Sequence, residues 1–565
     1  MQQHQNETKT CQNCKTDFII EIDDFAFYDK IKVPPPTFCP ECRMMRRFVY
    51  RNERKLFKVK DYFSEKIIFS LYPEEANRKV VTQDEWFSDS WTADDYARDF
   101  DFSRDFFTQL FELDKDIPIY ALNVKMMSNS DYCGNASALK NCYLLFNSSH
   151  TENSLYGSSV DNCRDCVDNT VLTNCERCYE SFYLLNCYQC YFSIMCAESS
   201  NLWFSRDCLS CSNCFGCTNL RKSSYCIFNK QYSKEEYFKE LQKMNLDTKS
   251  SLKESYDSAR IFWETQPVKS HQGLKNVNSA GAYVSHSKNV NDSYLVFDSE
   301  DLKYCQYMMV GGNKDCMDSC IWGEKSILNY ETSVCGENSY DLKFSLDCWP
   351  NVRSCEYSMH LKSCSDCFGC VGLRNKQYCI FNKQYTKEEY FEVVEKIKDH
   401  MNKNPYIDKK GNEYRYGEFF PIEFSPFGYN NTIAFEQFNL DKKDILLSNY
   451  PWIEVAMGEY KITREWKDVP EFINETNEDI CNEILECMSC HNPFKIVFDE
   501  YLFLKKENLP LPNNCHECRH KNRIKDRLKP FLYNKSCSLC NCNIKTAYSE
   551  NTIIYCESCY QKTFS

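Results

Sequence analysis

The sequence lacks the features that mark membrane-spanning and secreted proteins. No run of about 18 apolar residues occurs in the 565-residue chain, so a membrane-spanning helix is not expected. The polar start, MQQHQNETKT, has no apolar core of the kind found in secretory signal peptides. The formal net charge of −13 also argues against binding polyanions through bulk charge. Together these absences predict a cytoplasmic protein that does not associate with membranes.

Common catalytic motifs are missing as well. The chain has no G-x-S-x-G, no Walker phosphate loop, no dinucleotide fingerprint and no H-E-x-x-H. Acidic residues such as Asp161, Asp165 and Asp168 are interpreted as solvated turn residues. A carbohydrate-active solenoid enzyme is an alternative that would need a carboxylate pair facing one groove. We therefore expect a protein that is not an enzyme, and we identify no catalytic residue and no small-molecule substrate.

Histidine is scarce, whereas cysteine is abundant: the chain has 9 histidines and 38 cysteines. In a reducing compartment this composition predicts metal sites or buried thiols more than disulfides. A thiol or metal reservoir is a further alternative. It would require reversible disulfides or a metal content well above three ions per chain.

Two similar cysteine segments lie near the two ends of the chain, and a shift of 476 (487 − 11) superimposes them. Each contains two C-x-x-C pairs joined by a spacer of the same length, Lys15 to Phe38 in the first segment and His491 to Asn514 in the second. Four thiolates complete the tetrahedral shell of zinc, which predicts structural sites; two disulfides at each end are the alternative. The predicted ligands are Cys11, Cys14, Cys39 and Cys42 at one end and Cys487, Cys490, Cys515 and Cys518 at the other.

A third cysteine segment follows the same logic with a shorter spacer, from Asn541 to Tyr555. Its predicted ligands are Cys537, Cys540, Cys556 and Cys559, and Cys542 is an extra thiol that could compete as a ligand. The sequence therefore predicts about three structural Zn²⁺ ions per chain.

Basic segments follow the second C-x-x-C pair at both ends. Steps of four along the sequence would place three arginines on one face of a helix, where their guanidinium groups suit phosphate geometry. One interpretation is binding of RNA, a ribosome or DNA; the other is pairing with the chain's own carboxylates, which would lock the two ends onto the body. The candidate nucleic-acid-binding residues are Arg43, Arg47, Arg51, Arg519, Arg523 and Arg527.

The middle of the chain is rich in cysteines that recur at two intervals, a short one (175 − 163 = 12) and a long one (187 − 166 = 21). Asn frequently precedes Cys there, and short aromatic stretches alternate with Asn, Asp and Ser, which is typical of strands and turns. A parallel β-solenoid accounts for this pattern, because its repeats must stack to bury their inner faces. The interior cysteines are expected to be buried free thiols, with oxidised or metal-bound thiols as alternatives.

The end of this region is duplicated, since SCSNCFGC from Ser210 returns as SCSDCFGC from Ser363, at a shift of 153 (363 − 210). Each copy runs into a predicted helix with Ser233 or Thr386 as its N-cap and Glu at the third position. We expect these helices to cover the last open repeat of each solenoid, because uncovered strand edges invite aggregation.

The expected fold is therefore mainly β, with two tandem parallel β-solenoid lobes from an internal duplication, each capped by a helix and flanked by four-cysteine zinc ribbons. The expected segments are 1–60, zinc ribbon with basic helix; 61–128, helical or irregular connector; 129–244, first solenoid with capping helix; 245–290, linker; 291–403, second solenoid with capping helix; 404–480, aromatic connector; 481–530, second zinc ribbon with basic helix; and 531–565, third zinc ribbon.

The two end segments resemble the probable zinc-ribbon, treble-clef-like domain family in their C-x-x-C spacing and Pro-rich entry. Through NSDYCGNA, both YCIFNKQY segments, GEFFPIEFSPFGYNNTIA and YCESCY, most of the chain resembles a widespread group of cysteine-rich bacterial zinc-ribbon proteins. The resemblance implies zinc binding and no particular activity. We expect a non-enzymatic zinc-binding interaction or scaffold protein whose partner is a protein, or RNA or a ribosome.

Overall fold

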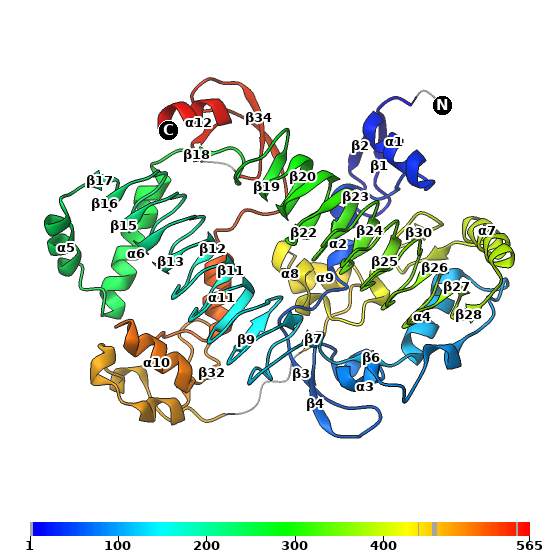
Figure 1. Ribbon diagram of the computed structural model, residues 1–565, viewed down its shortest axis with the longest axis horizontal. Coiled ribbons are helices and arrows are strands. Elements are labelled where there is room, and N and C mark those ends of the chain that lie inside the picture. The colour runs from blue at the N-terminus through cyan, green and yellow to red at the C-terminus, as the bar shows by residue number, and fades with distance from the viewer. Residues whose placement is uncertain (1–3, 439, 455–459, 550–551, 565) are drawn as a thin grey trace.

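The computed structural model describes residues 4–438, 440–454, 460–549 and 552–564. Two stacks of mostly parallel strands lie side by side, and helices and short hairpins surround them (Figure 1). Strands account for about 29% of the structure and helices for about 25%. The stacks are therefore its largest component, and the helical part is nearly as large as the strand part. Among the described residues, no helix has the length and apolar character needed to cross a membrane.

The first stack contains ten parallel strands and one short antiparallel strand. Neighbouring parallel strands pair at a constant offset of 12; Leu155 lies opposite Tyr143 (155 − 143), for example, and Ser212 opposite Ser200 (212 − 200). The strands are β7 (Val124–Lys125), β8 (Ala136–Ser137), β9 (Tyr143–Phe146), β10 (Leu155–Asp161), β11 (Thr170–Thr173), β12 (Phe182–Leu185), β13 (Tyr188–Tyr191), β14 (Ser200–Trp203), β15 (Ser212–Phe215), β16 (Ser224–Ile227) and the antiparallel β17 (Lys230–Gln231).

A period of three residues underlies the repeat of the first stack. All cysteines from Cys133 to Cys226 stand at multiples of three from Cys133, and all are buried. Asn174 and Asn186, which precede two of these cysteines, have φ angles of 53° and 52°. Asn tolerates this left-handed conformation better than most residues, so it turns the chain and directs the next side chain inward. The stacked amides also bond each other, as Asn174 Nδ2 donates to Asn186 Oδ1 at 3.1 Å.

The second stack has a less regular repeat. Tyr294 pairs with Gln306 (306 − 294 = 12), Tyr330 with Lys343 (343 − 330 = 13) and Ser299 with Asn313 (313 − 299 = 14). The strands are β19 (Ala280–Ser285), β20 (Lys288–Phe297), β21 (Ser299–Lys303), β22 (Gln306–Met308), β23 (Asn313–Cys320), β24 (Tyr330–Ser333), β25 (Lys343–Leu346), β26 (Ser365–Phe368), β27 (Gln377–Ile380) and the antiparallel β28 (Lys383–Gln384).

Helices cover the ends of both stacks at the positions expected from the duplicated sequence. α5 (Lys234–Lys243) follows the first stack and α7 (Lys387–Lys403) follows the second. Both predicted capping boxes are confirmed, because Ser233 and Thr386 each accept a hydrogen bond from the third residue of the helix and donate one in return. The segment expected as a linker, 245–290, contains α6 (Lys249–Glu264), β18 (Val268–Lys269) and β19.

The two connectors pack on the second stack. Phe106, from the first connector, contacts the Phe368 ring at a centroid distance of 5.5 Å. In the aromatic connector, Tyr416 donates a hydrogen bond to Glu356 of the second stack at 2.9 Å. Their elements are β3 (Phe57–Lys60), β4 (Ile67–Ser70), β5 (Val80–Val81), α3 (Gln83–Phe87), α4 (Phe106–Asp116), β6 (Ile119–Tyr120), β29 (Tyr406–Ile407), β30 (Glu413–Tyr414), α8 (Ile433–Gln437) and α9 (Lys442–Leu447).

Candidate metal centres and arginine clamps

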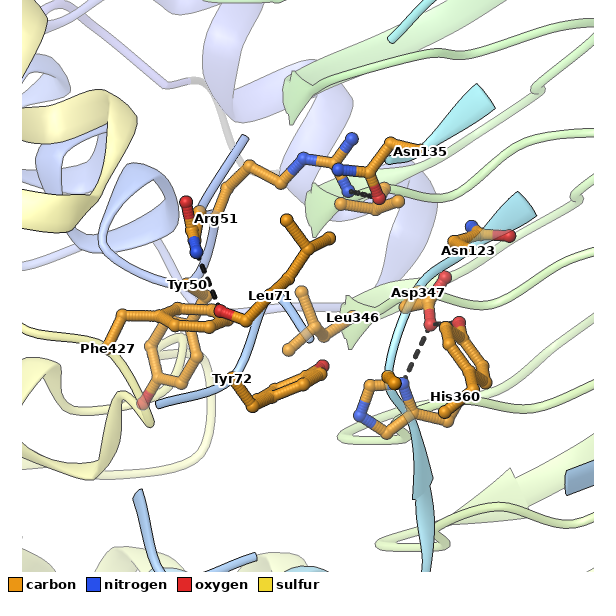
Figure 2. A pocket seen from close by; sticks show the side chains of 14 residues that line it. Tyr50, Arg51, Leu71, Tyr72, Asn123, Asn135, Leu346, Asp347, His360 and Phe427 are labelled. Atoms are coloured by element: carbon orange, nitrogen blue, oxygen red, sulfur yellow. Dashed lines mark hydrogen bonds and ion pairs between the residues drawn. The ribbon is translucent and has the colours of Figure 1, made fainter. Parts of the chain in front are cut away.

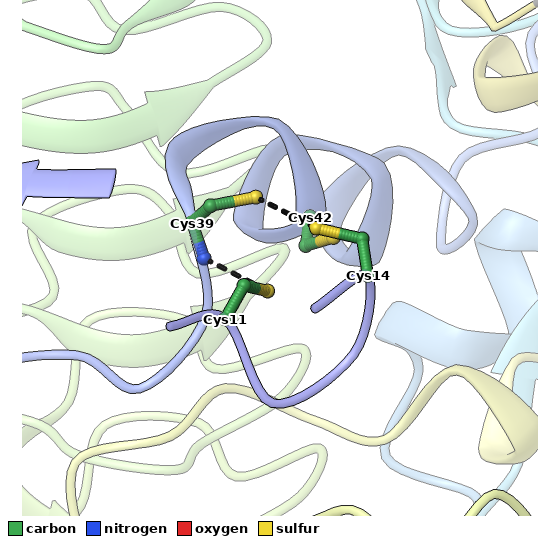
Figure 3. Close-up of side chains that lie close together, drawn as sticks. All are labelled: Cys11, Cys14, Cys39 and Cys42. Atoms are coloured by element: carbon green, nitrogen blue, oxygen red, sulfur yellow. Dashed lines mark hydrogen bonds between the residues drawn. The ribbon is translucent and has the colours of Figure 1, made fainter. Parts of the chain in front are cut away.

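The first cysteine cluster comprises the four predicted ligands Cys11, Cys14, Cys39 and Cys42. Cys11 and Cys14 lie in the turn between β1 (Glu7–Thr10) and β2 (Asp17–Ile20), and Cys39 is the N-cap of α2 (Pro40–Phe48). Figure 3 shows the side chains converging from this turn and from the start of the helix. The four sulfur atoms lie within 4.8 Å of one another, so the cluster could hold a metal ion.

The second cysteine cluster, Cys487, Cys490, Cys515 and Cys518, repeats this arrangement. It is formed by the turn between β31 (Leu485–Glu486) and β32 (Pro493–Phe494) and by the start of α11 (His516–Ile524). Helices α1 (Ile22–Ile31) and α10 (Phe498–Lys506) lie between the two pairs of the first and second clusters. Two short strands flank the first pair of each cluster, and the helix that follows the second of these strands brings the second pair into place.

The third cysteine cluster differs from the predicted ligand set. The four sulfurs within 4.8 Å of one another belong to Cys537, Cys540, Cys542 and Cys556, so the extra thiol Cys542 replaces Cys559 in the compact group. Cys559 still interacts with Cys556, Cys540 and Cys537. Its elements are β33 (Tyr533–Ser536), β34 (Asn543–Thr546), β35 (Ile554–Tyr555) and α12 (Glu557–Phe564). Five thiols thus gather around a site that needs four.

The sulfur spacing of all three clusters fits a tetrahedral thiolate site. Zinc–sulfur bonds of about 2.3 Å place neighbouring sulfurs about 3.8 Å apart. The separations are 3.6 Å between Cys14 and Cys39, and 3.8 Å in the second and third clusters. Backbone N–H groups also donate to ligand sulfurs, as Cys39 N does to Cys11 Sγ at 3.2 Å. Such bonds stabilise thiolates, which are the metal-binding form of cysteine.

One cysteine in each of the second and third clusters is favoured as a thiolate for the same reason. Burial tends to raise the pKa of Cys487, but backbone N–H groups of Cys515, Cys490 and Ser489 outweigh it and lower the pKa to about 6. The pKa of Cys537 is likewise lowered to about 6 against burial, chiefly by the backbone N–H of Cys556. The residues present therefore suit a divalent metal that prefers sulfur.

The basic segment after the first cluster forms buried ion pairs with the second stack. We call this set of ion pairs the first clamp. Arg43 and Arg47 reach Asp318 at 2.9 and 3.1 Å, and Arg47 also reaches Glu331 at 3.0 Å. Arg46 lies between Glu331 and Glu418, at 2.8 Å from each. All these side chains are buried. The amino end of the chain is thereby fastened to the second stack, not to the first stack that follows it in sequence.

The corresponding arginines after the second cluster contact the first stack and form the second clamp. Arg519 lies 3.0 Å from Asp168 and 2.8 Å from Glu500 of α10. Arg523 reaches Asp168 at 3.4 Å and Glu180 at 2.9 Å. The two clamps use matching carboxylates, since Asp168 and Glu180 occupy consecutive repeats, as Asp318 and Glu331 do. In Figure 1, α2 lies against the second stack and α11 against the first. Each clamp therefore joins one end of the chain to the stack that is more distant from it in sequence, and we call this arrangement crossed.

The last predicted arginine of each set lies beyond its helix. α2 ends at Phe48 and α11 at Ile524, so neither helix carries three arginines on one face at the predicted positions. Arg51 donates to Asn135 and Asn147 of the first stack at 3.0 and 2.6 Å, and Arg527 lies 3.3 Å from Glu436 of α8.

Burial changes the interpretation of the arginines. The side chains of Arg43, Arg47, Arg519, Arg523 and Arg527 are no more than 5% exposed. These arginines form ion pairs with the chain's own carboxylates, which the sequence analysis gave as the alternative to nucleic-acid binding. Phosphate contact through these residues would require both clamps to open, so nucleic-acid binding stays a prediction that this arrangement does not favour. Asp168, expected in a solvated turn, is instead fully buried at the second clamp.

Most interior cysteines of the two stacks lie within hydrogen-bond distance of a backbone carbonyl oxygen. Cys175 Sγ donates to the carbonyl of Thr173 at 3.3 Å, and Cys364 Sγ donates to that of Lys362 at 3.4 Å. The same bond to the carbonyl two positions earlier recurs at most interior cysteines. A thiol that donates to a carbonyl is neutral, so this bonding favours inert filler over metal ligands. All cysteines in the described part of the chain are free of disulfides.

Comparisons with known proteins leave the family of the chain open. No family model matches the chain, and no curated protein matches it. One solved structure with some similarity is described as a putative acetyltransferase from Desulfovibrio desulfuricans G20; the match covers 52% of this chain and 85% of that chain at 10% identity, with a TM-score of 0.11. A score that low carries no argument about fold or function.

Proposed function

We propose that this chain is a non-enzymatic, zinc-dependent scaffold in which metal sites at its two ends fasten two β-solenoid lobes into one body. Support for the solenoid assignment comes from parallel pairing at a constant offset throughout the first stack and at slightly varying offsets in the second. Zinc is the metal that best suits four thiolates at this spacing. Free thiols throughout the described chain are consistent with a reducing cytoplasm.

The crossing of the two clamps is the observation that carries this proposal. The first and second cysteine clusters each include the N-cap of one helix, α2 or α11, and that helix delivers its arginines to paired carboxylates of the lobe that is distant in sequence. A single helical turn separates Cys42 from Arg46. Loss of the metal would release the helix start and the buried arginines together. Zinc would therefore control how firmly the two lobes are joined.

Cleaving the chain between the stacks tests the proposal. A specific protease site inserted after Asn278, which is exposed, separates the first lobe and first cluster from the second lobe and the other clusters. Because both clamps cross this cut, the two fragments should remain associated after cleavage. A zinc chelator should then separate them or weaken their association strongly. Size-exclusion chromatography with elemental analysis of the same fractions measures both effects.

Two outcomes would contradict the proposal. If elemental analysis finds no zinc in freshly prepared, reduced protein, the proposed metal sites are wrong. Fragments that stay equally associated after complete zinc removal show that the contacts between the stacks, and not the clamps, join the lobes. An uncut chain treated with the same chelator serves as the control for unfolding. Its far-UV circular dichroism reports whether the strands of each lobe survive without metal.

A further inference from the structure

The third cysteine cluster contains one thiol more than a tetrahedral metal site can use. The first and second clusters each bring four cysteines together, whereas Cys559 and the compact group of four in the third cluster make five. Four thiolates complete the shell of zinc, so one thiol of the third cluster stays free at any time. A free thiol beside the metal ligands gives this cluster a reaction partner that a closed four-cysteine site lacks.

Two thiols of the third cluster are also open to solvent. Cys540 and Cys542 are both exposed, and a single residue separates them in the sequence. In the first cluster only Cys14 is exposed, and the four described cysteines of the second cluster are all buried or half-buried. Thiols that act as redox sensors are accessible and often lie beside a second, resolving thiol. Of the three described clusters, the third alone offers such a pair.

The two exposed thiols are close enough to form a disulfide. The Cys540 and Cys542 sulfurs lie within 4.8 Å of each other, and both residues belong to the turn between β33 and β34. The backbone N–H and the thiol of Cys542 both approach the Cys540 sulfur. A disulfide has a sulfur–sulfur distance of about 2.05 Å, so closing the pair requires a shift of less than about 3 Å. Distance and access thus both favour a bond between these two residues.

We propose that Cys540 and Cys542 are a redox-active pair through which a small disulfide, such as oxidised glutathione, removes zinc from the third cluster. The inference rests on the proposed zinc occupancy of the clusters. The Cys540 thiolate attacks one sulfur of the small disulfide, so that a mixed disulfide forms and one thiolate of the reagent leaves. Cys542 gives its proton to solvent and attacks the Cys540 sulfur, and the second thiolate of the reagent leaves.

The reaction balances, and it removes ligands from the metal. Two protein thiols are oxidised to one disulfide, and the reagent is reduced to two thiols. The thiols that remain are those of Cys537, Cys556 and Cys559. Three thiolates no longer close the tetrahedral shell, so the affinity for zinc falls. A reducing agent reverses the step and restores the site.

The third cluster holds the carboxy-terminal elements against both stacks. α12 begins directly after Cys556, and its Tyr560 hydroxyl donates to Asp207 of the first stack at 2.8 Å. β35 pairs in parallel with β18, in the segment that joins the stacks, and Lys545 of β34 forms an ion pair with Asp292 of the second stack. Figure 1 shows α12 and β34 together with β18, beside β19. Loss of the third zinc would therefore loosen contacts with both stacks.

The carboxy-terminal elements also border a cleft of about 1080 Å³ between the two stacks. α12 contributes Glu557, Tyr560 and Phe564 to its lining. The first-stack wall of the cleft includes both Asn135 and Asp207, which are six repeats of 12 residues apart (207 − 135 = 72). At about 4.8 Å per repeat these positions are roughly 29 Å apart, so α12 lies near one end of the cleft and Asn135 near the other.

The Asn135 end of the cleft is held by bonds that do not involve thiols. A small cavity of about 40 Å³ adjoins the cleft there, and Figure 2 shows Arg51 bonded to Asn135 beside it. His360 pairs with Asp347 in the wall of the same cavity, and none of the described residues that line it is a cysteine. Oxidation of the pair should therefore loosen the α12 end of the cleft and leave the Asn135 end unchanged.

Zinc release from the full, zinc-loaded chain tests the inference. An excess of oxidised glutathione should release one of the three zinc ions, which a chromogenic zinc chelator detects. Cys542→Ser keeps four thiols in the third cluster but lacks the pair, so its release should be about tenfold slower or more. Cys559→Ser also keeps four thiols but retains the pair. It is the matched control and should release zinc as fast as the unmodified chain.

Two further measurements locate the reaction. Mass spectrometry of the oxidised chain should find a peptide that spans 537–542 and is lighter by two hydrogen atoms, with fragmentation placing the bond between Cys540 and Cys542. Hydrogen exchange should accelerate in 557–564 and stay unchanged in 40–48, which belongs to the first cluster and α2. Adding a reducing agent and zinc should reverse both changes.

Two results would overturn the inference. One is zinc release from the unmodified chain that is no faster than release from Cys542→Ser. The other is oxidised protein without a disulfide between Cys540 and Cys542. A chain that holds no zinc before oxidation contradicts the proposed function instead, and the disulfide mapping still tests the pair. If Cys542→Ser loses the third zinc under reducing conditions, the mapping in the unmodified chain decides the question.

Discussion

Replacing Glu331 by glutamine should destabilise the first clamp strongly. Its carboxylate is fully buried and lies 2.8 Å from Arg46 and 3.0 Å from Arg47. Burial raises the pKa of Glu331, and the two arginines oppose that rise. The substitution keeps the volume of the side chain but removes the charge that compensates two buried guanidinium groups. Breaking a buried ion pair costs about 3–5 kcal/mol, because the remaining charge stays desolvated. Arg46 and Arg47 keep Glu418 and Asp318 as partners, so we expect the lower end of this range.

Hydrogen exchange is the most direct measurement of this loss. A destabilisation of about 3 kcal/mol corresponds to a roughly 100-fold or greater increase in the opening constant of α2. Mass spectrometry of peptides covering 40–48 should detect that acceleration in Glu331→Gln. Peptides covering α11, whose arginines contact the other stack, should exchange at the unmodified rate. The zinc content should be measured in the same sample, because loss of metal would accelerate exchange for a different reason.

Glu300→Gln is the matched control on the same stack. Glu300 pairs with Lys288 and Lys314 at 2.7 and 3.1 Å, but these side chains are largely exposed to solvent. Exposed pairs contribute little because solvent screens them, so this variant should not change the exchange of α2. If Glu331→Gln accelerates exchange no more than Glu300→Gln does, the clamp does not hold the amino end. The proposed role of the crossed arginines would then be wrong.

Three further outcomes are expected. Burial raises the pKa of Asp161 to about 6, above its ordinary value of about 3.9, so the free energy of unfolding should fall by no more than about 3 kcal/mol as the pH rises from about 4 to 6. Urea titrations should show that Asp161→Asn, which keeps an oxygen for Ser149, loses this dependence; an unchanged pH profile would contradict the assignment. Cys542→Ser and Cys559→Ser should each retain the third zinc, whereas the double variant should lose it; a single variant that already loses one zinc by elemental analysis would identify an obligatory ligand. Brief alkylation of the native zinc-loaded chain should modify the half-buried Cys481 but none of the interior thiols of 163–226, and modified interior peptides in the mass spectrum would show that the first stack opens readily.

The repeat of the first stack could have been derived more completely from the sequence. The two cysteine intervals (175 − 163 = 12 and 187 − 166 = 21) are both multiples of three, and Asn precedes Cys163, Cys175 and Cys187. Those two facts together define a three-residue repeat, in which a residue with a left-handed backbone conformation precedes a residue whose side chain points inward. The same repeat is hard to recognise in the second stack. Its longer offsets (330 − 317 = 13 and 313 − 299 = 14) are not multiples of three, so its cysteines do not keep a three-residue spacing. Such insertions are tolerated at turns and leave no local signal.

The crossed clamps could not be predicted from local patterns. Equivalent arginines at the two ends were visible, as was the possibility that they pair with the chain's own carboxylates. Their partners, Asp318 for Arg43 and Asp168 for Arg519, are far from them in sequence. Either end could in principle have docked on either lobe. Only the three-dimensional course of the connectors, which pack on the second stack, decides which lobe each end reaches.

Each end of the chain also touches the stack that its own clamp does not hold. Arg51, which follows α2, bonds Asn135 and Asn147 of the first stack, and the backbone N–H of Leu528, which follows α11, donates to the Tyr283 hydroxyl of the second stack. Both ends therefore bridge the two lobes beside the cleft that lies between them. Arg51 and Tyr283 also line that cleft. The helices that begin at the first and second metal clusters therefore lead directly into residues that bridge the two lobes, so release of either helix start would also loosen this bridge.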